Sequence, residues 1–246
     1  MLYLLLSILI QVALVIHVLR TGRNMLWILV IALLPLVGTL AYLIVEILPE
    51  FLRGRTARRA VSNVKRTLDP TRDLRDAHRQ VRITGSIDSR RRFADELFNN
   101  GKYREAIEQY RAALTGLYEY DPLLLLGVAK AQFALDEFSN ARQTLDTLIK
   151  ENPDFKSPEG HLLYARALDA EGNKEQARKE YEALVKYYPG AEARYRYAVL
   201  LRELGEAAQA RELLQLLMTD AELAGKHFRK EQREWLALAK RELDQI

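Results

Sequence analysis

Hydrophobic residues follow two different patterns along the chain. Residues 2–19 form an almost unbroken apolar run, and residues 25–48 form a second, longer one. A helix of about 18 residues is about 27 Å long, close to the thickness of the hydrocarbon core of a bilayer. Because only the polar residues 20–24 separate the runs, the pattern predicts a hairpin of two transmembrane helices over residues 1–49.

A cleaved secretory signal is the alternative interpretation of the first run. Such a signal has a basic segment before its apolar core and a cleavage site of small residues after it. Residues 1–3 include no basic side chain, and no site of this kind precedes the second run. The sequence therefore favours retention of both segments.

From about residue 86, hydrophobic positions recur with a long period instead. Four blocks align on an alanine, with spacings of 35, 36 and 33 residues: Ala106, Ala141, Ala177 and Ala210. A second small residue stands twelve positions before each: Ala94, Ala129, Ala165 and Ala198. An aromatic residue or leucine stands four positions after each: Tyr110, Leu145, Tyr181 and Leu214. This pattern predicts four pairs of antiparallel helices with a common design.

The residue types explain how such pairs would pack. Small residues let the two helices of a pair cross closely, and the larger residue fills the space beside the next pair, so that stacked pairs share one core. The period and the pattern resemble the tetratricopeptide repeat family. The resemblance implies an all-α fold, with an α-solenoid over residues 86–225 and a capping helix over residues 226–246. We expect Pro122, Pro153 and Pro189 to end the second helices of three pairs.

Aromatic residues near the end of the array divide between packing and exposure. Four tyrosines surround Pro189-Gly190: Tyr187, Tyr188, Tyr195 and Tyr197. We assign Tyr188 and Tyr197 to packing between helices, and Tyr195 to the surface. Trp235, in the expected capping helix, is assigned to the core.

Charge divides the chain at about the same place. Residues 1–85 carry 12 Lys and Arg but 5 Asp and Glu, whereas the rest carries 25 and 28. Basic residues are retained on the cytoplasmic side of a membrane, and the larger cluster follows the second run. We therefore expect both termini and the array in the cytoplasm, at a bacterial inner membrane, although Arg20 and Arg23 in the short loop oppose this orientation.

Residues 50–85 form a basic linker in which apolar residues recur at helical spacing. We expect two amphipathic helices, one before and one after Asp69-Pro70. The basic side chains of the first stretch are candidates for contact with anionic lipid headgroups: Arg55, Arg58, Arg59, Lys65 and Arg66. Alternatively this charge only fixes the orientation, and we favour that role for the second stretch, where Asp73 and Asp76 dilute the charge.

Four residues mark the second apolar run. Trp27 and Tyr42 suit the membrane interfaces, Pro35 interrupts the helical hydrogen bonds, and Gly38 permits close approach of another helix. Over residues 3–46 these positions resemble the N-terminal membrane domain of bacterial cardiolipin synthases of the phospholipase D class. The resemblance implies an anchor whose soluble part lies in the cytoplasm.

The catalytic motif of that family is missing. Its chemistry uses His-x-Lys-x4-Asp, and no histidine of this chain is followed two positions later by lysine: His17, His78, His161 and His227. The chain also has no cysteine, which excludes disulfides and cysteine-based catalysis or metal binding. Because no glycine-rich phosphate loop, metal-spaced cluster or nucleophile motif is present either, we expect no cofactor and no enzymatic activity. The basic linker lacks interleaved aromatic residues, which argues against nucleic-acid binding.

In tetratricopeptide proteins the first helix of each pair lines a concave groove. By repeat position, the inward residues here are Arg91, Asp95, Phe98, Leu126, Lys130, Phe133, Leu162, Arg166, Asp169, Tyr195 and Arg202. An apolar middle with basic residues along it suits a peptide with apolar anchors and some acidic residues; the alternative for each residue is ordinary solvated surface. The family subtype that clamps a C-terminal carboxylate needs Asn and Lys where this chain has Asp95 and Glu159, so we do not expect that function.

These features predict a membrane-anchored scaffold or adaptor that mediates protein–protein interaction at the cytoplasmic face of the bacterial inner membrane. One alternative is an accessory factor for phospholipid or envelope biogenesis, which the likeness of the anchor favours. Another is a periplasm-facing assembly factor, which a reversed orientation would imply. Self-association of the chain is compatible with each of these.

Overall fold

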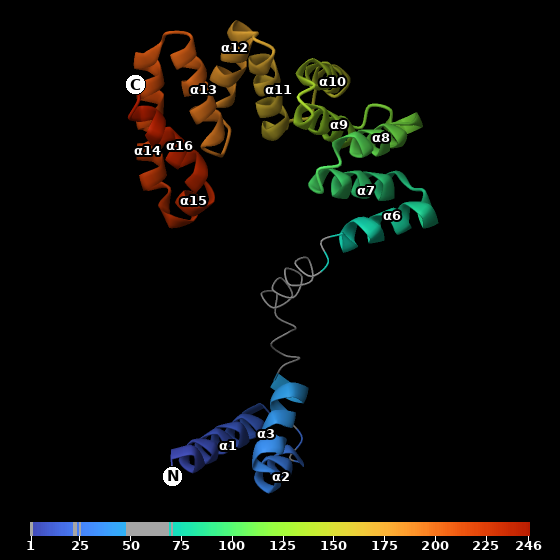
Figure 1. Ribbon diagram of the computed structural model, residues 1–246, viewed down its shortest axis with the longest axis vertical. Coiled ribbons are helices and arrows are strands. Elements are labelled where there is room, and N and C mark those ends of the chain that lie inside the picture. Colours follow the sequence, from blue (N-terminus) through green and yellow to red (C-terminus); the bar gives the residue numbers. More distant parts are fainter. Residues whose placement is uncertain (1, 22–23, 25, 48–68, 70) are drawn as a thin grey trace. The chain divides into compact units, whose positions relative to one another are not determined.

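A computed structural model describes residues 2–21, 24, 26–47, 69 and 71–246. By its internal contacts the chain divides into two compact units, Met1–Arg72 and Asp73–Ile246, each of which is described by itself. Throughout the described residues the regular elements are helices and none is a strand (Figure 1). The all-α prediction is therefore confirmed.

The described part of the first unit packs a 20-residue helix and shorter ones around a small apolar core. Its elements are α1 (Leu2–Thr21), α2 (Leu26–Leu33), α3 (Pro35–Tyr42) and a π-helical turn, η1 (Leu43–Ile47). The core is formed by four buried side chains: Leu14, Val18, Ile31 and Tyr42. The Tyr42 hydroxyl lies 2.9 Å from His17 Nδ1, and its ring meets Trp27 edge to face at 5.3 Å. Tyr42 thus links α1, α2 and α3.

The second apolar run is not one continuous helix. The backbone departs from helical geometry at Leu34 (φ −125°, ψ 76°), and Pro35, which has no N–H to donate, begins α3. Helix α3 approaches α2 so closely that a Cβ on Gly38 would lie 2.2 Å from the carbonyl oxygen of Val30. The single span expected over residues 25–48 is therefore two short helices that meet at a required glycine.

Among the helices of the described residues, none has both the length and the apolar character that crossing a membrane requires. The predicted hairpin of two membrane spans is thus not supported by the structure. Orientation relative to a membrane stays a prediction.

The second unit is an array of four helix pairs. Its members are α7 (Ile87–Asn99) with α8 (Tyr103–Ala113), α9 (Pro122–Ala134) with α10 (Phe138–Glu151), α11 (Pro158–Ala170) with α12 (Lys174–Leu184), and α13 (Glu192–Glu203) with α14 (Ala207–Leu223). The pairs follow one another along an arc (Figure 1), as expected of an α-solenoid. Helix α6 (Arg72–Thr84) precedes them, and its Leu74 packs against the core of the first pair.

The aligned small residues lie where the helices cross. All eight alanines of the repeat pattern are fully buried, and the larger residues that follow them fill the space toward the next pair. The fit is tightest between the first and second pairs, where a Cβ on Gly127 would lie 2.6 Å from the ring of Tyr110. Only a residue without a side chain lets α9 pack on this tyrosine.

Turns within and between pairs follow local backbone chemistry. The turn of the second pair uses Asp136 at φ 59°, a conformation that aspartate tolerates better than most residues. Pro153 and Pro189 follow the second helices of their pairs, as predicted. Pro122 instead begins α9, where the Asp121 carboxylate accepts hydrogen bonds from the N–H groups of Leu123 and Leu124. The prediction that Pro122 ends a helix is therefore wrong.

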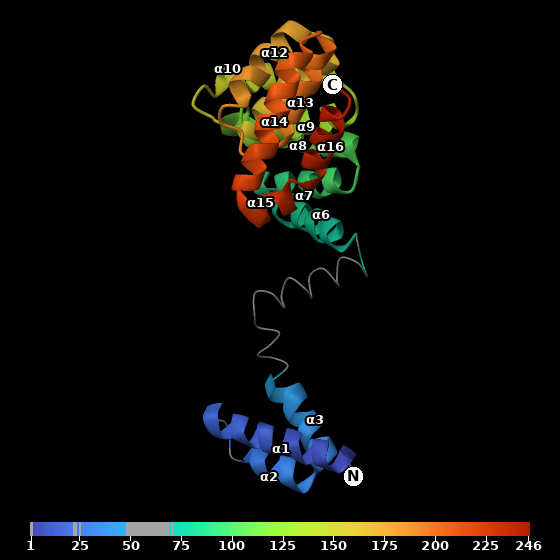
Figure 2. The same cartoon turned by 90° about the vertical axis from the view of Figure 1, so that its left-hand side faces the viewer.

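The capping segment is two helices, α15 (Gly225–Glu231) and α16 (Arg233–Leu243), and not one. They meet at Gln232, whose side-chain oxygen accepts a hydrogen bond of 3.0 Å from the Ala191 N–H. Trp235 and Leu236 of α16 pack against the core of the last two pairs. Helix α16 contacts both α13 and α14 and lies beside them in the second view (Figure 2).

Candidate functional site

The first helices of three pairs line a groove of about 1060 Å³. Eight of the eleven inward residues expected from repeat position lie in its wall: Arg91, Asp95, Phe98, Leu126, Lys130, Phe133, Leu162 and Arg166. They come from α7, α9 and α11, which the stacking of the pairs places side by side. The groove is therefore one surface built from segments that are far apart in the sequence.

Aromatic side chains form the apolar part of this groove. Phe98 of α7 meets Tyr103 at a ring distance of 5.2 Å, and Phe133 of α9 meets Phe138 at 5.0 Å. Tyr103 and Tyr188 also line the groove, although the sequence placed Tyr188 only in packing between helices. The sequence does offer a signal for this: Tyr188 lies in the loop between α12 and α13, just before the first helix of the fourth pair.

Charges in the groove are more balanced than the sequence suggested. Lys130 Nζ lies 2.8 Å from a carboxylate oxygen of Glu159. Asp95 accepts a hydrogen bond of 2.5 Å from the Tyr110 hydroxyl, and burial together with this bond raises the pKa of Tyr110. Counting Asp136 and Glu192 as well, four acidic and three basic side chains line the groove, so it is not cationic.

Arg166 is the least satisfied charge in the groove. Its guanidinium lies over the Phe133 ring at 4.5 Å, and its Nη1 stands 3.6 Å from the Glu192 carboxylate. Its Nε is buried and has no hydrogen-bond partner among the described residues. Burial lowers the pKa of Arg166, and the nearby Arg196 charge adds to this effect. A carboxylate that entered the groove would pair with the accessible part of the guanidinium, which is 29% exposed.

Three expected groove residues lie elsewhere. The Asp169 carboxylate is 2.5 Å from Lys174 Nζ. Tyr195 is half-buried against Trp235, at a ring distance of 5.8 Å, so the expectation that it is exposed is wrong. Arg202 Nε lies 2.8 Å from the buried carboxylate of Glu242 in α16. Helix α16 occupies the inner side of the fourth pair and uses the positions that would otherwise line a groove.

The candidate lipid-binding residues of the linker lie outside the described residues: Arg55, Arg58, Arg59, Lys65 and Arg66. Their role stays a prediction. Trp27, Gly38 and Tyr42 of the expected membrane motif all take part in contacts between α1, α2 and α3, while Pro35 starts α3. In this unit the motif residues organise the fold.

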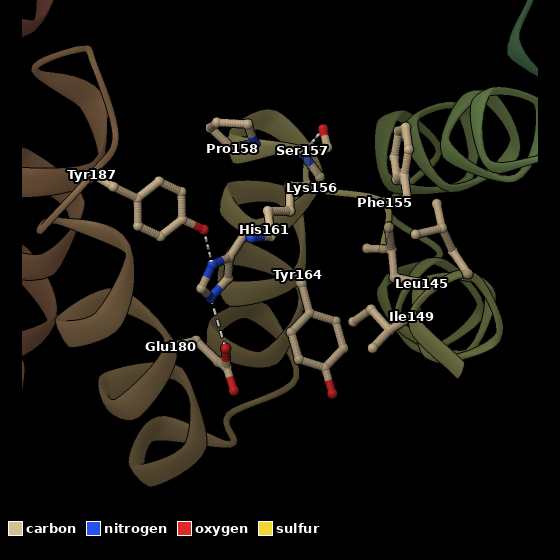
Figure 3. Close-up of a pocket in the computed structure, with 12 residues that line it drawn as sticks. Leu145, Ile149, Phe155, Lys156, Ser157, Pro158, His161, Tyr164, Glu180 and Tyr187 are labelled. Carbon is tan, nitrogen blue, oxygen red and sulfur yellow. Dashed lines mark hydrogen bonds and ion pairs between the residues drawn. The ribbon is translucent and has the colours of Figure 1, made fainter. Parts of the chain in front are cut away.

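A second cavity, of about 610 Å³, lies between α10, α11 and α12 (Figure 3). Its apolar wall includes Leu145, Ile149 and Phe155, which lie across the cavity from His161 and Tyr164 in that view. No sequence pattern singles out this place. Its residues come from three helices and two loops, so only the fold brings them together.

The polar wall of this cavity is internally hydrogen-bonded. His161 Nε2 lies 2.7 Å from a Glu180 carboxylate oxygen, and His161 Nδ1 makes a short contact with the Tyr187 hydroxyl. Tyr164 donates a hydrogen bond of 2.8 Å to Asp146, and burial together with this bond raises its pKa to about 12. Glu180 is therefore held in place by His161.

A carboxylate, an imidazole and a hydroxyl in series have the form of a catalytic relay. Burial and the Glu180 charge raise the pKa of Tyr187, however, so its phenol is harder to deprotonate than that of an ordinary tyrosine. No group of three or more acidic or histidine side chains in the described part of the chain is arranged to hold a metal ion.

Comparison with known proteins agrees with this architecture. Two sequence models of the tetratricopeptide repeat family match, over residues 97–159 and 162–221. No curated protein matches the chain.

Among solved structures, several of the protein MamA have a similar fold. MamA from Desulfovibrio magneticus RS-1 is 15% identical, with 66% of this chain and 91% of that chain covered and a TM-score of 0.56. The MamA RS-1 ArsTM double mutant is also 15% identical, with 66% and 90% covered and a TM-score of 0.56. A further MamA crystal structure is 16% identical, with 69% and 90% covered and a TM-score of 0.54. At these identities the likeness concerns the fold alone.

Helix pairing, buried alanines, the repeat period and the two family matches all agree. The chain is a tetratricopeptide repeat protein.

Proposed function

We propose that the array is a protein-interaction scaffold that binds a segment of a partner protein in the groove formed by α7, α9 and α11. One observation carries the proposal: residues chosen by repeat position from three separate pairs line one continuous groove. Solenoid arrays present concave surfaces of this kind to their partners. A chain with this architecture acts through binding.

The groove chemistry specifies the partner segment. Phe98, Phe133 and Tyr188 offer places for apolar side chains. Arg166 lies over Phe133 and lacks a full set of hydrogen bonds, so an acidic residue beside an apolar anchor complements it. A strongly basic segment would instead bring like charge to Arg166, whereas Lys130 is already paired with Glu159.

Selection of peptides from a random phage-displayed library on the full-length chain tests this function. Selected peptides should combine an aromatic or aliphatic residue with a nearby Asp or Glu. Phe133→Asp and Arg166→Glu should each weaken their binding about tenfold or more, since each removes a buried contact and adds repulsion. Arg229→Glu is the matched control because Arg229 is exposed on α15, outside the groove. If the selected peptides bind both groove variants as tightly as they bind the Arg229→Glu control, the groove is excluded as their binding site.

We also infer that the first unit attaches the array to a membrane, with the array in the cytoplasm. The support is the outer surface of this unit, where large aliphatic side chains are exposed on α1, α2 and α3, including Leu9, Leu19, Leu29, Leu33 and Val37. Contiguous exposed apolar surface is typical of contact with lipid or with another protein. The charge distribution in the sequence supports the cytoplasmic orientation.

Cell fractionation tests this attachment. The full-length chain should sediment with membranes and resist extraction by alkaline carbonate, whereas a chain lacking residues 1–72 should not. Reporters active only in the cytoplasm or only in the periplasm, fused after Ile246, then report the side. A full-length chain recovered without membranes would refute attachment, and a periplasmic signal would refute the orientation alone.

A further inference from the structure

The four helix pairs do not pack alike near the ends of their second helices. Eight positions after each aligned alanine stand Leu114, Ile149, Val185 and Met218. Leu114, Val185 and Met218 pack against the core, as the repeat requires. Ile149 is instead 52% exposed and lines the 610 Å³ cavity between α10, α11 and α12. The second pair thus leaves apolar surface open where the others close it.

A histidine accounts for part of this difference. His161 occupies, in the first helix of the third pair, the position of the buried Leu125 in the second pair. Glu180 and Tyr187 hold the imidazole from two sides, so it cannot turn to cover Ile149 (Figure 3). The result is an open apolar cavity with a fixed polar wall.

The array also carries an apolar projection. The loop between α8 and α9 is longer than the repeat requires and includes a 3-10 turn, η2 (Gly116–Tyr118). Leu117 at its tip is 101% exposed, and Tyr118 and Tyr120 are also exposed. The loop is anchored at its base, because Asn152 Nδ2 donates a hydrogen bond of 2.8 Å to the Tyr120 carbonyl. An anchored projection loses little conformational entropy when it binds.

Projection and cavity lie along the same edge of the array. The loop that carries Leu117 and the loops that carry Phe155 and Tyr187 each connect the second helix of one pair to the first helix of the next. Connections of this kind gather at one edge of a stack of helix pairs. Two copies facing each other along this edge can exchange projections reciprocally, which gives a closed two-fold contact.

The charges at the two places are complementary. Glu119 is exposed beside the apolar tip. Lys156 is exposed in the cavity wall and makes no ion pair within the described residues. A copy whose loop enters the cavity would bring Glu119 toward Lys156. The other charged side chain of the wall, Glu180, contacts His161, so Lys156 is the charge left for an incoming acidic residue.

We propose that this cavity is a self-association site, and that a second copy of the chain inserts its Leu117 loop there. Leu117 of each copy fills the space against Ile149 and Phe155 of the other. The contact uses neither the groove nor the first unit, so it stands or fails independently of the proposed function.

Site-specific disulfide formation between full-length chains is the direct test, because the chain has no cysteine of its own. One copy carries Tyr118→Cys beside the loop tip, and a differently tagged copy carries Asp154→Cys beside Phe155. Mixed under mild oxidation, they should form a disulfide-linked heterodimer. Leu223→Cys replaces Tyr118→Cys in the control, since Leu223 is also highly exposed but lies on α14. Equal cross-linking of the control pair would overturn the proposal.

Substitutions at the tip and the rim make the test quantitative. Adding Leu117→Asp to the Tyr118→Cys chain should slow the cross-link about tenfold or more, because a leucine buried in the contact is worth over one decade in an equilibrium constant. Lys156→Glu should weaken it less, and Glu119→Lys in the other copy should restore it. If Lys156→Glu and Glu119→Lys each weaken the cross-link and their combination does not restore it, the charge pairing is overturned. If Leu117→Asp has no effect on the cross-link, the insertion is overturned.

Discussion

The fourth helix pair and the three before it share one repeat pattern but present different inner surfaces. In the first three pairs, Arg91, Phe133 and Arg166 line an open groove. In the fourth, Tyr195 and Arg202 at comparable positions contact Trp235 and Glu242 of α16. Repeat position thus identifies which side chains face inward, while the following element decides whether a partner can reach them.

The largest effect is expected where α16 covers the fourth helix pair. Leu236→Asp places an unpaired charge where α16 packs on the fourth pair, and should lower the free energy of unfolding by roughly 3 kcal/mol. Urea denaturation measures the loss, and hydrogen exchange should show α16 losing protection first. Leu223→Asp makes the same change at an exposed position and should stay within about 0.5 kcal/mol. If both variants lower the free energy of unfolding equally, α16 does not pack stably on the fourth pair.

A smaller effect is expected beside the open groove, where Gly127 of the second pair contacts Tyr110 of the first. Gly127→Ala should destabilise the protein by about 1–2 kcal/mol, because displacement of the Tyr110 ring outweighs the better helix propensity of alanine. The groove residue Asp95 would also lose its hydrogen bond. Gly160→Ala is the control, since its new Cβ would meet nothing closer than 3.3 Å. A neutral Gly127→Ala variant would show that Tyr110 can move freely.

Alkaline pH should destabilise the array through its buried tyrosines. The pKa of Tyr164 is raised to about 12 in the folded state, against about 10 in an unfolded chain. The folded state therefore holds the Tyr164 proton more tightly. The contribution of Tyr164 to the free energy of unfolding is constant below about pH 10 and falls as the pH rises toward 12. Tyr164→Phe should reduce this fall by about 1 kcal/mol, with allowance for solvent screening. Urea denaturation of both proteins at about pH 9 and about pH 11 measures this difference in the free energy of unfolding. If Tyr164→Phe loses as much stability between these pH values as the unmodified chain, the prediction is contradicted.

The smallest effects separate two equivalent tyrosines. Tyr110 donates a hydrogen bond to Asp95, so Tyr110→Phe should cost about 1 kcal/mol. The Tyr181 hydroxyl is buried and has no partner in the part of the chain that the structure describes, so Tyr181→Phe should be neutral or slightly stabilising. Thermal unfolding of the two variants, measured side by side, makes the comparison. The reverse order of stability would mean that the Tyr181 hydroxyl has a hydrogen-bond partner in solution.

The repeated fold could be predicted because its signals are local. Alanines at regular spacing, a turn residue between helices and a large residue one helical turn later describe each pair without reference to distant residues. The same reasoning selected eight residues that line one groove, and their part in binding stays a prediction. It failed where a distant segment takes over a position, as α16 does at Tyr195 and Arg202. At Leu34-Pro35 it predicted the interruption of the helical hydrogen bonds but not the division of the span into two short helices.

The sequence alone determined the helix pairs, their order and the inward face of each first helix, since these depend on neighbours within about one repeat. Only the tertiary structure decided that the fourth pair is covered and that the cavity beside Ile149 stays open. It also brought His161 between Glu180 and Tyr187. The physical reason is the same in each case: packing between elements of different pairs depends on shape and partner geometry, which the repeat pattern does not encode.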